Sequence, residues 1–328
     1  MDDLKRIALL HGAGYAGGEL IRLLLNHPAL RLEAVTSRSF AGQPLWAAHP
    51  TLRAHTDLAF IAPDAFEPGG VDAVLVAAEH GQGAVVVQAL LDGGFEGAVV
   101  DLSADFRFAE AGIYETWFRT EHPAPALLDA FTYGLPEVNA PYATRCVANP
   151  GCFATGLSLA LWPLARGGEG LDASVTALTG ASGSGTRPSA TTHFPTREGN
   201  VRAYKILAHQ HLPEVWQVLG PAVEVAFVPV SGPWTRGIWG TAHVRLARPL
   251  DAGAVAARFE QAYAEAPFVR LWPGRLPELH YAVGTPFCDV GWVAEDGRLV
   301  VGFALDNLLK GAASQAVQNL NLLLGLPE

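Results

Sequence analysis

The sequence predicts an α/β protein with a doubly wound parallel sheet in its first half and a mixed sheet in its second half. In residues 1–148, short apolar runs alternate with runs of helical period, which is typical of a parallel sheet covered on both faces. After residue 149, runs of alternating apolar and polar residues follow one another, which indicates an antiparallel or mixed sheet with helices on one face. The chain has 328 residues, 50% of them hydrophobic, which is enough for two cores.

The first half is expected to alternate strands and helices. The predicted strands are "KRIALL" (5–10), "RLEAVTS" (31–37), "VDAVLVAAE" (71–79) and "GAVVDLSA" (97–104). One helical run at 19–25 follows the first strand, and another follows the third strand and reaches about residue 91.

The second half is expected to be richer in strands. Strand-like runs lie at 173–185, 223–230, 237–247 and 298–306. Helical period is found at 157–164 and 252–265, and the last segment, 307–324, is expected to form one long amphipathic helix. The segment 180–201, rich in Gly, Ser and Thr, is the longest without periodicity, and loops of that length are often functional.

Composition and charge exclude several classes of protein. The formal net charge is −10 and Lys and Arg form no run, which argues against nucleic-acid binding. The apolar runs are shorter than the roughly 20 residues of a membrane-spanning helix. The N-terminus begins with acidic residues and lacks the layout of a signal peptide, so we expect a cytoplasmic protein. Three cysteines without a CxxC pair predict free thiols and no metal site.

A glycine-rich loop stands between the first predicted strand and the first predicted helix. Residues 12–17, "GAGYAG", match G-x-G-x-x-G, with Gly12, Gly14 and Gly17 at the glycine positions and Tyr15 and Ala16 between the last two. Glycines there permit a tight turn and a close backbone approach, and a pyrophosphate binds at the helix N-terminus. The strand-loop-helix context therefore predicts dinucleotide binding by these residues.

The second predicted strand indicates which dinucleotide is bound. A site that prefers NAD has an Asp or Glu about twenty residues after the glycines, which binds the ribose 2′-hydroxyl. This chain has Thr36-Ser37-Arg38-Ser39 instead. Because hydroxyls and a guanidinium suit a 2′-phosphate, Ser37 and Arg38 predict NADP(H) as the cofactor.

Cys152 lies where the chain must turn and a helix begins. It follows Asn149-Pro150-Gly151 in "NPGCFATG" (149–156) and precedes a helical run. A helix N-terminus favours the thiolate form of a cysteine, and a thiolate can attack an acyl carbon to give a thioester that accepts hydride. We therefore interpret Cys152 as a nucleophile, and Cys146 and Cys288 as buried thiols.

A thiol nucleophile needs a base, and "HQHLPEV" (209–215) supplies two candidates, His209 and His211. Two histidines at this spacing face the same way in a strand and diverge in a helix. Pro213 indicates a helix start directly after His211. The residues themselves leave both histidines open as the base.

The whole chain resembles the N-acetyl-gamma-glutamyl-phosphate reductase family of arginine biosynthesis and its close relative in carrier-protein lysine biosynthesis. The shared motifs are "GAGYAGGELIRLLLNHP" (12–28), "DLSADFR" (101–107), "YGLPE" (133–137), "NPGCFATG" (149–156), "HQHLPEV" (209–215), "RGI" (236–238) and "DNLLKGAASQAVQNLN" (306–321). The resemblance implies a Rossmann-like NADP-binding domain completed by the C-terminal helix (1–148 and 307–328). It also implies an α+β catalytic and dimerisation domain of the semialdehyde dehydrogenase type (149–306), in a homodimer or homotetramer.

The resemblance also implies roles for individual residues. Cys152 would attack the acyl phosphate, phosphate would leave, and NADPH would reduce the thioester to the semialdehyde. His211, the second histidine of the family's H-x-H-x-P-E pattern, would be the general acid/base, with His209 as the rival position. Glu214 would orient that histidine or hold the substrate.

Further candidate residues lie in or beside the shared motifs. Because a substrate with a carboxylate and a phosphate needs cationic donors, the substrate contacts are expected from Arg107, Asn149, Arg202, Tyr204, Glu214 and Arg236. Additional cofactor contacts are expected from His80, which follows the third strand at its carboxyl end, and from Ser182, Gly183 and Asn307.

The sequence leaves the substrate open between the two relatives. Segments 35–53 and 192–205 are more similar to the lysine-pathway relative, whereas "NPGCFATG" is more similar to the arginine enzyme. An acidic carrier protein would favour a basic partner, and the net charge of −10 argues against one. We therefore expect N-acetyl-gamma-glutamyl phosphate as substrate, with carrier-linked aminoadipyl phosphate, or both, as the alternative.

Two other classes of protein remain as alternatives. A phosphorylating dehydrogenase of the aspartate-semialdehyde type has the same chemistry, but "HQHLPEV" and the "DNLLKG" motif (306–311) argue against it. A non-enzymatic NADP sensor would need the glycine loop but neither Cys152 nor His211.

Overall fold

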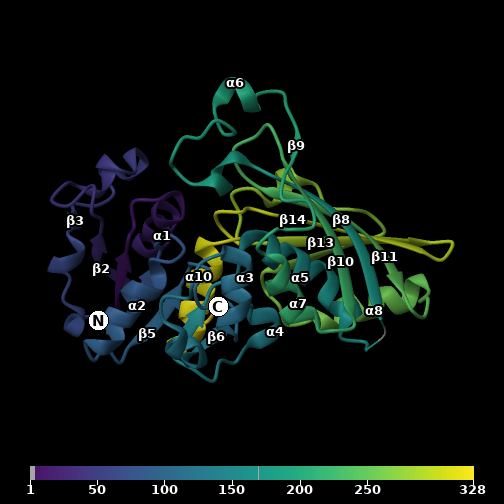
Figure 1. Cartoon of the computed structure of the whole chain (residues 1–328), viewed down its shortest axis with the longest axis horizontal. Helices are drawn as coiled ribbons and strands as arrows, with labels where there is room; N and C mark the ends of the chain where they lie inside the picture. The colour runs from purple at the N-terminus through teal and green to yellow at the C-terminus, as the bar shows by residue number, and fades with distance from the viewer. Residues whose placement is uncertain (1–3, 169) are drawn as a thin grey trace. The chain divides into compact units, whose positions relative to one another are not determined.

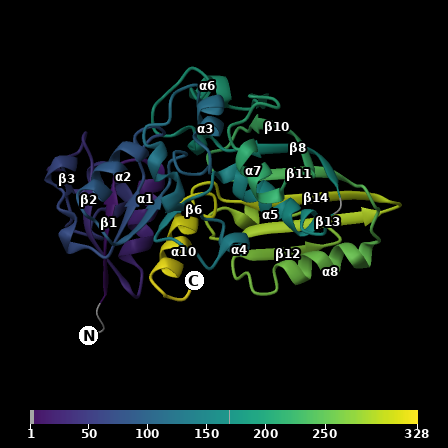
Figure 2. The same cartoon turned by 60° about the horizontal axis from the view of Figure 1, so that its bottom comes forward.

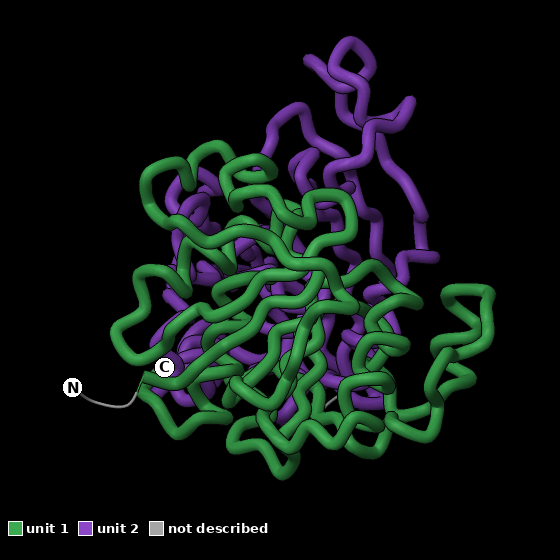
Figure 3. Tube along the Cα trace, turned by 90° about the vertical axis from the view of Figure 1, so that its left-hand side faces the viewer, with its two compact units in different colours: residues 1–150, 312–328 green, residues 151–311 purple. Residues whose placement is uncertain are grey.

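The computed structural model describes residues 4–168 and 170–328. The chain forms two compact units, which Figure 3 shows in different colours. Unit 1 comprises residues 1–150 and 312–328, and unit 2 comprises residues 151–311. The sequence placed the corresponding boundaries after residues 148 and 306.

Unit 1 is built on a parallel sheet. All its strand pairs are parallel, as expected where helices connect successive strands. The strands in spatial order are β3 (Phe60–Ile61), β2 (Leu30–Thr36), β1 (Lys5–Leu10), β4 (Ala73–Val76), β5 (Ala98–Asp101), β7 (Cys146–Ala148) and β6 (Phe131–Tyr133).

The helices of unit 1 cover its sheet and form two apolar clusters. These helices are α1 (Tyr15–Leu25), α2 (Gly83–Asp92), α3 (Ala111–Phe118), α4 (Pro136–Asn139) and α10 (Ala313–Leu323). Leu20, Ile21 and Leu24 of α1 pack with Ala316 and Leu320 of α10 in one cluster. Val87 and Leu90 of α2 belong to the other cluster. The parallel, doubly wound architecture predicted for the first half is therefore confirmed.

The C-terminal helix is shorter than the sequence pattern predicted. We expected a helix over 307–324, but α10 begins at Ala313. The side chain of Asp306 accepts a hydrogen bond from the backbone N–H of Leu308, and its carbonyl accepts one from Gly311. These bonds hold residues 306–311 in a turn, so the helical period there was misleading.

Unit 2 is built on a mixed sheet. The pairs β8–β10 and β12–β13 are parallel, and the other pairs are antiparallel. The strands in spatial order are β12 (Val269–Pro273), β13 (Cys288–Glu295), β14 (Arg298–Leu305), β11 (Ile238–Leu246), β8 (Leu171–Thr179), β10 (Val223–Ser231) and β9 (Arg202–Ala203).

Helices cover one face of this sheet, as Figures 1 and 2 show for α5, α7 and α8. The helices of unit 2 are α5 (Cys152–Ala165), α6 (Phe194–Arg197), α7 (Leu212–Leu219), α8 (Ala252–Ala262) and α9 (Leu279–Ala282). In β10, Val223, Val225 and Phe227 are buried, whereas Glu224 and Ala226 on the opposite face are exposed. This alternation is what the sequence pattern predicted, and the mixed sheet with helices on one face is confirmed.

The sequence analysis missed strands β12 and β13. The first five residues of β13 are all buried, so the alternation that marks a half-exposed strand is absent. The run also contains Asp289, whose carboxylate can be buried here because Arg270 of β12 forms an ion pair with it.

The helix α5 lies in the core of unit 2. Nearly all its residues are buried, from Phe153 to Leu164. A Cβ on Gly156 would lie 2.4 Å from the ring of Phe303, so glycine there lets α5 approach β14 closely. None of the helices in residues 4–168 and 170–328 is long and apolar enough to cross a membrane.

Candidate active site

Cys152 is the first residue of α5, and glycine backbone surrounds it. Gly151 is the N-cap of the helix, and a Cβ placed on it would lie 2.4 Å from Nε2 of His211. A Cβ placed on Gly311 would lie 2.7 Å from the Cβ of Cys152. Gly151 therefore lets His211 lie against the turn that carries the half-buried thiol of Cys152, and Gly311 lets a second turn approach Cys152 closely.

Glu214 connects this turn to the histidine. It lies in the first turn of α7, is 0% exposed, and accepts a hydrogen bond of 2.9 Å from the backbone N–H of Gly151. Its other carboxylate oxygen lies 4.0 Å from Nε2 of His211. One buried carboxylate thus fixes the helix cap beside Cys152 and faces the neighbouring imidazole.

His209 and His211 have different surroundings. His209 is enclosed by the rings of Phe153, Phe227 and Tyr204, with centroid distances of 5.3, 5.7 and 5.9 Å. Its Nδ1 accepts a hydrogen bond from the backbone N–H of His211. Burial, with a smaller contribution from His211, lowers the pKa of His209 to about 2. His209 is therefore neutral at physiological pH and braces the backbone of His211.

Tyr204 and Arg202 lie beside the same cluster. The backbone N–H of Tyr204 donates to the carbonyl of Pro229 in β10, and Arg202 lies 5.9 Å from the centre of the tyrosine ring. Burial raises the pKa of Tyr204, and the charge of Cys152 raises it further. The phenol is therefore a neutral donor near the cysteine.

Arg236 is held by a buried carboxylate. Its Nε and Nη2 donate to the two oxygens of Asp306 at 3.1 and 3.2 Å. Asp306 is 0% exposed and also accepts from the backbone N–H groups of Gly284 and Leu308. The Arg236 side chain is 27% exposed, so this bidentate pair fixes a guanidinium that still reaches the surface.

Asn307 joins the same turn to a loop after β8. Its Oδ1 accepts from the backbone N–H of Gly237 at 2.7 Å, and its Nδ2 donates to Oγ of Ser182 at 2.9 Å. Gly183 lies next to this amide, since a Cβ on it would be 3.8 Å from Nδ2 of Asn307. The structure thus brings Ser182, Gly183 and Asn307 together in unit 2.

In unit 1, the glycine loop connects β1 to α1. A Cβ on Gly12 would lie 2.4 Å from a methyl carbon of Val35, and one on Gly17 would lie 2.2 Å from the carbonyl oxygen of Gly12. There is no room for a side chain at Gly12 or Gly17. Because both residues are glycine, α1 can pack closely against the strands. Gly14, the N-cap of α1, has nothing within 4 Å of an added Cβ.

This geometry fits a dinucleotide. The space beside Gly14 is open, and a Cβ would fill part of it. The backbone N–H groups at the start of α1 have no side-chain cap and can bind an anion. Tyr15 is exposed and Ala16 is half-buried on the first turn of α1. The loop can therefore hold a pyrophosphate against its backbone.

Ser37 and Arg38 follow β2, next to this loop. Ser37 is buried, and its Oγ accepts from the backbone N–H of Phe40. Arg38 is exposed. Burial and then the charge of Arg38 lower the pKa of His11, the residue before Gly12, so the guanidinium acts on the glycine loop.

His80 follows β4 in a loop that the buried carboxylate of Asp105 fixes. Its Nδ1 accepts from the backbone N–H of Ala104 at 2.9 Å. Asp105 accepts from the backbone N–H groups of Gly81 and Ala84 at 2.7 and 2.8 Å. The loop before α2 is thus tied to the "DLSADFR" segment (101–107).

Arg107 and Asn149 support the chain that leads to the cysteine turn. Arg107 donates to the carbonyls of Asn149 and Leu102, each at 2.9 Å. The Asn149 side chain accepts from Nδ2 of Asn319 and donates to the carbonyl of Ala312. Asn149 is 1% exposed, so its observed contacts hold the end of β7 in place.

Sequence reasoning missed three residues that the structure connects to these sites. Asp306 holds Arg236, and Arg197 donates to the carbonyl of Thr179 at the end of β8. His49 makes a hydrogen bond of 2.8 Å between Nε2 and the carbonyl of Gly12. The position of Asp306 beside Asn307 in one motif was the available signal; for Arg197 and His49 the pairing depends on distant chain segments.

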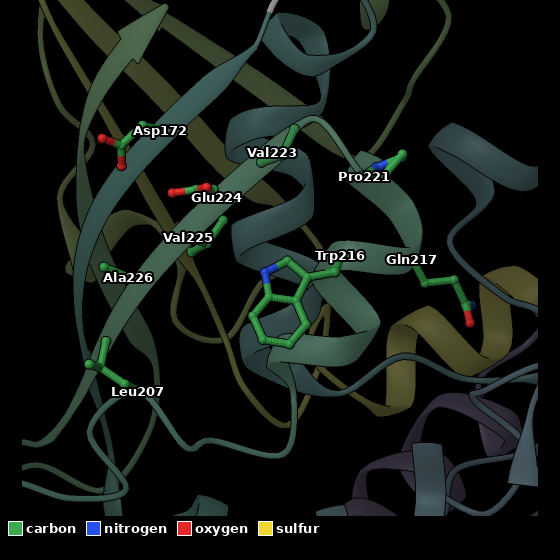
Figure 4. Close-up of a pocket in the computed structure, with 10 residues that line it drawn as sticks. Asp172, Leu207, Trp216, Gln217, Pro221, Val223, Glu224, Val225 and Ala226 are labelled. Atoms are coloured by element: carbon green, nitrogen blue, oxygen red, sulfur yellow. The ribbon is translucent and has the colours of Figure 1, made fainter. Parts of the chain in front are cut away.

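A groove of about 740 Å³ lies elsewhere in unit 2 (Figure 4). Trp216 and Gln217 of α7 line one side of it, and 223–226 of β10 line another. None of the predicted site residues lines this groove. Within residues 4–168 and 170–328, no group of three or more His, Cys, Asp or Glu side chains is arranged to hold a metal ion.

Comparison with protein families matches both parts of the chain. Residues 6–145 match the model described as semialdehyde dehydrogenase, NAD binding domain. Residues 152–307 match the model described as semialdehyde dehydrogenase, dimerisation domain.

Relatives of similar length are known. The chain is 42% identical to an N-acetyl-gamma-glutamyl-phosphate reductase of Methanosarcina acetivorans, over 98% of this chain and 96% of that protein. It is 40% identical, with the same coverage, to a Thermomicrobium roseum protein that carries the provisional name LysW-L-2-aminoadipate 6-phosphate reductase. Aspartate semialdehyde dehydrogenase II of Vibrio cholerae shares the fold, with a TM-score of 0.77 at 19% identity over 98% of this chain and 99% of that one.

Proposed function

This chain belongs to the N-acetyl-gamma-glutamyl-phosphate reductase family, and we propose that it reduces N-acetyl-gamma-glutamyl phosphate to N-acetylglutamate 5-semialdehyde and phosphate with NADPH. The observation that carries the proposal is the Cys152 turn: a half-buried thiol at the start of α5, with His211 against its cap and Glu214 bonded to that cap. The relative from Methanosarcina acetivorans supports the same substrate.

Cys152 is the proposed nucleophile. Its position at the first residue of α5 favours the thiolate, because the N–H groups of the first turn and the helix dipole stabilise negative charge. The sulfur attacks the acyl carbon, the carbon–oxygen bond to the phosphoryl group breaks, and phosphate leaves with the electron pair. The product of this step is a thioester on Cys152.

His211 is the proposed acid/base. Its ring lies against Gly151, one residue before the thiol, whereas His209 is buried, neutral and bonded to the His211 backbone. His211 accepts the thiol proton before attack and returns a proton to the substrate oxygen during reduction. His211 then takes the hydroxyl proton back as the carbon–sulfur bond breaks, which releases the aldehyde and restores the thiolate.

NADP(H) is the proposed cofactor, which supplies a hydride to the thioester carbon when it is bound. The open space beside Gly14 suits the pyrophosphate, and Tyr15, Ala16 and the close-packed Gly12 and Gly17 form the rest of that loop. Further contacts are assigned to Ser182, Gly183, Asn307 and His80. Ser37 and Arg38, in place of an acidic residue, favour the 2′-phosphate of NADP.

The substrate is proposed to bind in unit 2 through charged and phenolic donors. Arg236 offers a guanidinium that Asp306 holds in a fixed orientation. Arg202 lies over the ring of Tyr204, whose pKa the charge of Cys152 raises. Glu214 acts by orienting His211 and Gly151. Arg107 and Asn149 act by supporting the chain before the cysteine.

A carrier-linked substrate is the second candidate. The 40% identity to the Thermomicrobium roseum protein favours carrier-linked aminoadipyl phosphate, which needs the same bond changes at Cys152. We also propose a homodimer or homotetramer in the cytoplasm. The description of the family model for residues 152–307 as a dimerisation domain supports the oligomer.

The reverse reaction tests the proposal. Purified protein receives NADP, phosphate and N-acetylglutamate semialdehyde, and NADPH is followed by its absorbance. We expect phosphate-dependent NADPH formation that Cys152→Ala reduces by more than about 10³-fold, because the thioester cannot form.

Binding of NADPH by Cys152→Ala, measured by fluorescence titration, is the control. It should equal that of the unmodified protein, since the glycine loop is untouched. Loss of NADPH binding together with turnover would assign Cys152 a structural role instead. Activity only with the carrier-linked aminoadipate semialdehyde would select the second candidate.

A further inference from the structure

Arg197 is the last residue of α6, in a segment whose side chains are mostly exposed. Residues 183–191 are all exposed, and α6 stands away from the sheet of unit 2 in Figures 1 and 2. Arg197 differs from most of the segment, because its side chain is partly buried and its Nη2 donates to the carbonyl of Thr179 at 3.0 Å. The guanidinium therefore returns from the exposed segment to the end of β8.

A donor of this guanidinium has no acceptor in the described chain. Nε of Arg197 is buried and makes no hydrogen bond within residues 4–168 and 170–328. Buried polar groups nearly always have a partner, and a buried cationic donor without one is destabilising. The position of Nε thus calls for an acceptor from outside the chain.

The surroundings of Arg197 are positive. Burial lowers the pKa of Arg197, Tyr204 acts in the opposite direction, and the charge of Arg202 lowers it again. Neither arginine forms an ion pair with a carboxylate of the described residues. Two neighbouring guanidiniums without a carboxylate between them repel each other, and a bound anion would relieve that repulsion.

The same two arginines border the cysteine cluster. Arg202 lies over the ring of Tyr204, on whose pKa both Arg197 and Cys152 act. Thr179, which Arg197 contacts, precedes the loop of Ser182 that Asn307 holds. An anion bound by Arg197 would therefore lie at the candidate active site.

We propose that Arg197 and Arg202 form an oxyanion subsite of unit 2, in which Arg197 Nε donates to a phosphoryl or carboxylate oxygen of the substrate. The proposal rests on the acyl-phosphate chemistry proposed above and assigns Arg197 as a substrate-contact residue. The Thr179 carbonyl fixes the guanidinium, and Tyr204 supports Arg202.

The reverse reaction distinguishes the two oxyanions, because phosphate and the semialdehyde are then separate substrates. KM values for phosphate, semialdehyde and NADP are measured for the full chain and for Arg197→Met and Arg197→Lys. We expect Arg197→Met to raise one of the first two by about 10- to 100-fold, as for a lost charge-assisted hydrogen bond, with KM for NADP unchanged. Arg197→Lys keeps the positive charge but loses the planar, bidentate donors of the guanidinium, so it should raise the same KM by a smaller factor.

The KM that rises identifies the group: phosphate indicates the phosphoryl oxygen, and the semialdehyde indicates the carboxylate. Arg187→Met is the matched control, because Arg187 lies in the same exposed segment and the same charge is removed. An equal rise in KM for Arg187→Met and Arg197→Met would overturn the subsite, because it would show that the positive charge of the whole segment attracts the substrate. Unchanged KM values in an Arg197→Met protein with normal thermal unfolding would also overturn it.

A binding readout separates this proposal from the proposed function. Alkylation of Cys152 by iodoacetamide, a neutral reagent, is timed with and without phosphate or N-acetylglutamate. At least one of the two anions should slow alkylation of the unmodified protein and leave the rate in Arg197→Met unchanged, whether or not turnover is seen. No protection by either anion in the unmodified protein would refute the subsite.

Discussion

His209 is a buried imidazole whose neutral form the fold requires. It is 3% exposed, aromatic rings surround it, and its Nδ1 accepts from the backbone N–H of His211. A proton on Nδ1 would place a donor against that N–H, and a charge there would be desolvated. At the scale of single residues, burial thus separates two histidines that the sequence could not distinguish.

The stability of the protein should therefore fall in mild acid. Burial lowers the folded-state pKa of His209 from 6.5 to about 2, so the unfolded chain binds one more proton at this residue between those values. The stabilisation is complete above about pH 6.5 and is lost as the pH falls. Between pH 7 and pH 5 we expect His209 alone to cost roughly 2 kcal/mol of unfolding free energy, measured by urea denaturation.

The variant His209→Asn isolates this contribution. Its Oδ1 can accept from the His211 backbone without a titrating ring, so the loss between pH 7 and pH 5 should shrink by roughly 2 kcal/mol. A pH dependence identical to that of the unmodified protein would show that His209 is already protonated in the folded state or exposed to water.

At the scale of elements, the turn after β14 organises unit 2. Asp306 fixes Arg236, and Asn307 fixes Gly237 and Ser182, so two consecutive residues hold both a cation and a loop. Unit 2 also contains a second bidentate pair of the same type, in which Asp289 of β13 accepts from Nε and Nη2 of Arg270 at 2.5 and 2.9 Å. The two carboxylates are each 0% exposed.

Disrupting either pair should lower the stability of the protein by a similar amount, but only one of the two disruptions should affect catalysis. Asp306→Asn and Asp289→Asn each leave a partly buried guanidinium poorly paired, which should cost about 1–3 kcal/mol in chemical denaturation. Only Asp306→Asn should also raise KM for the semialdehyde, by about 10-fold, because Arg236 loses its orientation. Equal KM changes in both variants would show that the effect is general softening of unit 2.

Much of the fold follows from sequence periodicity, and the exceptions have physical causes. Strands with one exposed face, such as β8 and β10, were predictable because apolar and polar residues alternate. Strand β13 was not, because its first half is buried on both faces, and the start of α10 was not, because Asp306 bonds hold 306–311 in a turn. Periodicity does not encode such tertiary contacts.

The candidate site was predictable where one motif carries the chemistry. Cys152 is identified by the turn and helix signals around it, whereas His211 and Glu214 were assigned by the resemblance of "HQHLPEV" (209–215) to the family's pattern. The structure brings all three together within unit 2. Arg197 was missed because its side chain donates to the carbonyl of Thr179, eighteen positions away, and because the loop that also brings the charge of Arg202 to bear on it has no periodicity. Such a contact is visible only in the folded chain.

At the scale of the whole molecule, the proposed determinants of cofactor choice and most of the proposed substrate contacts lie in different units. The glycine loop and Arg38 belong to unit 1, whereas Cys152, His211 and the arginines proposed to bind the substrate belong to unit 2. We therefore expect substitutions in unit 1 to change the preference between NADP and NAD while the KM values for phosphate and semialdehyde stay the same.

Arg38→Ala tests this separation. Arg38 is exposed beside the glycine loop, and its charge already acts on His11 there. Without the guanidinium, a 2′-phosphate loses a charge-assisted contact, so KM for NADPH should rise by about 10- to 100-fold while KM for NADH stays within about 2-fold. The KM for phosphate should not change, since the residues proposed to bind phosphate lie in unit 2. Equal rises for NADPH and NADH would mean that Arg38 shapes the loop and does not read the 2′-phosphate. A rise in KM for phosphate would show instead that the two units share the determinants of binding.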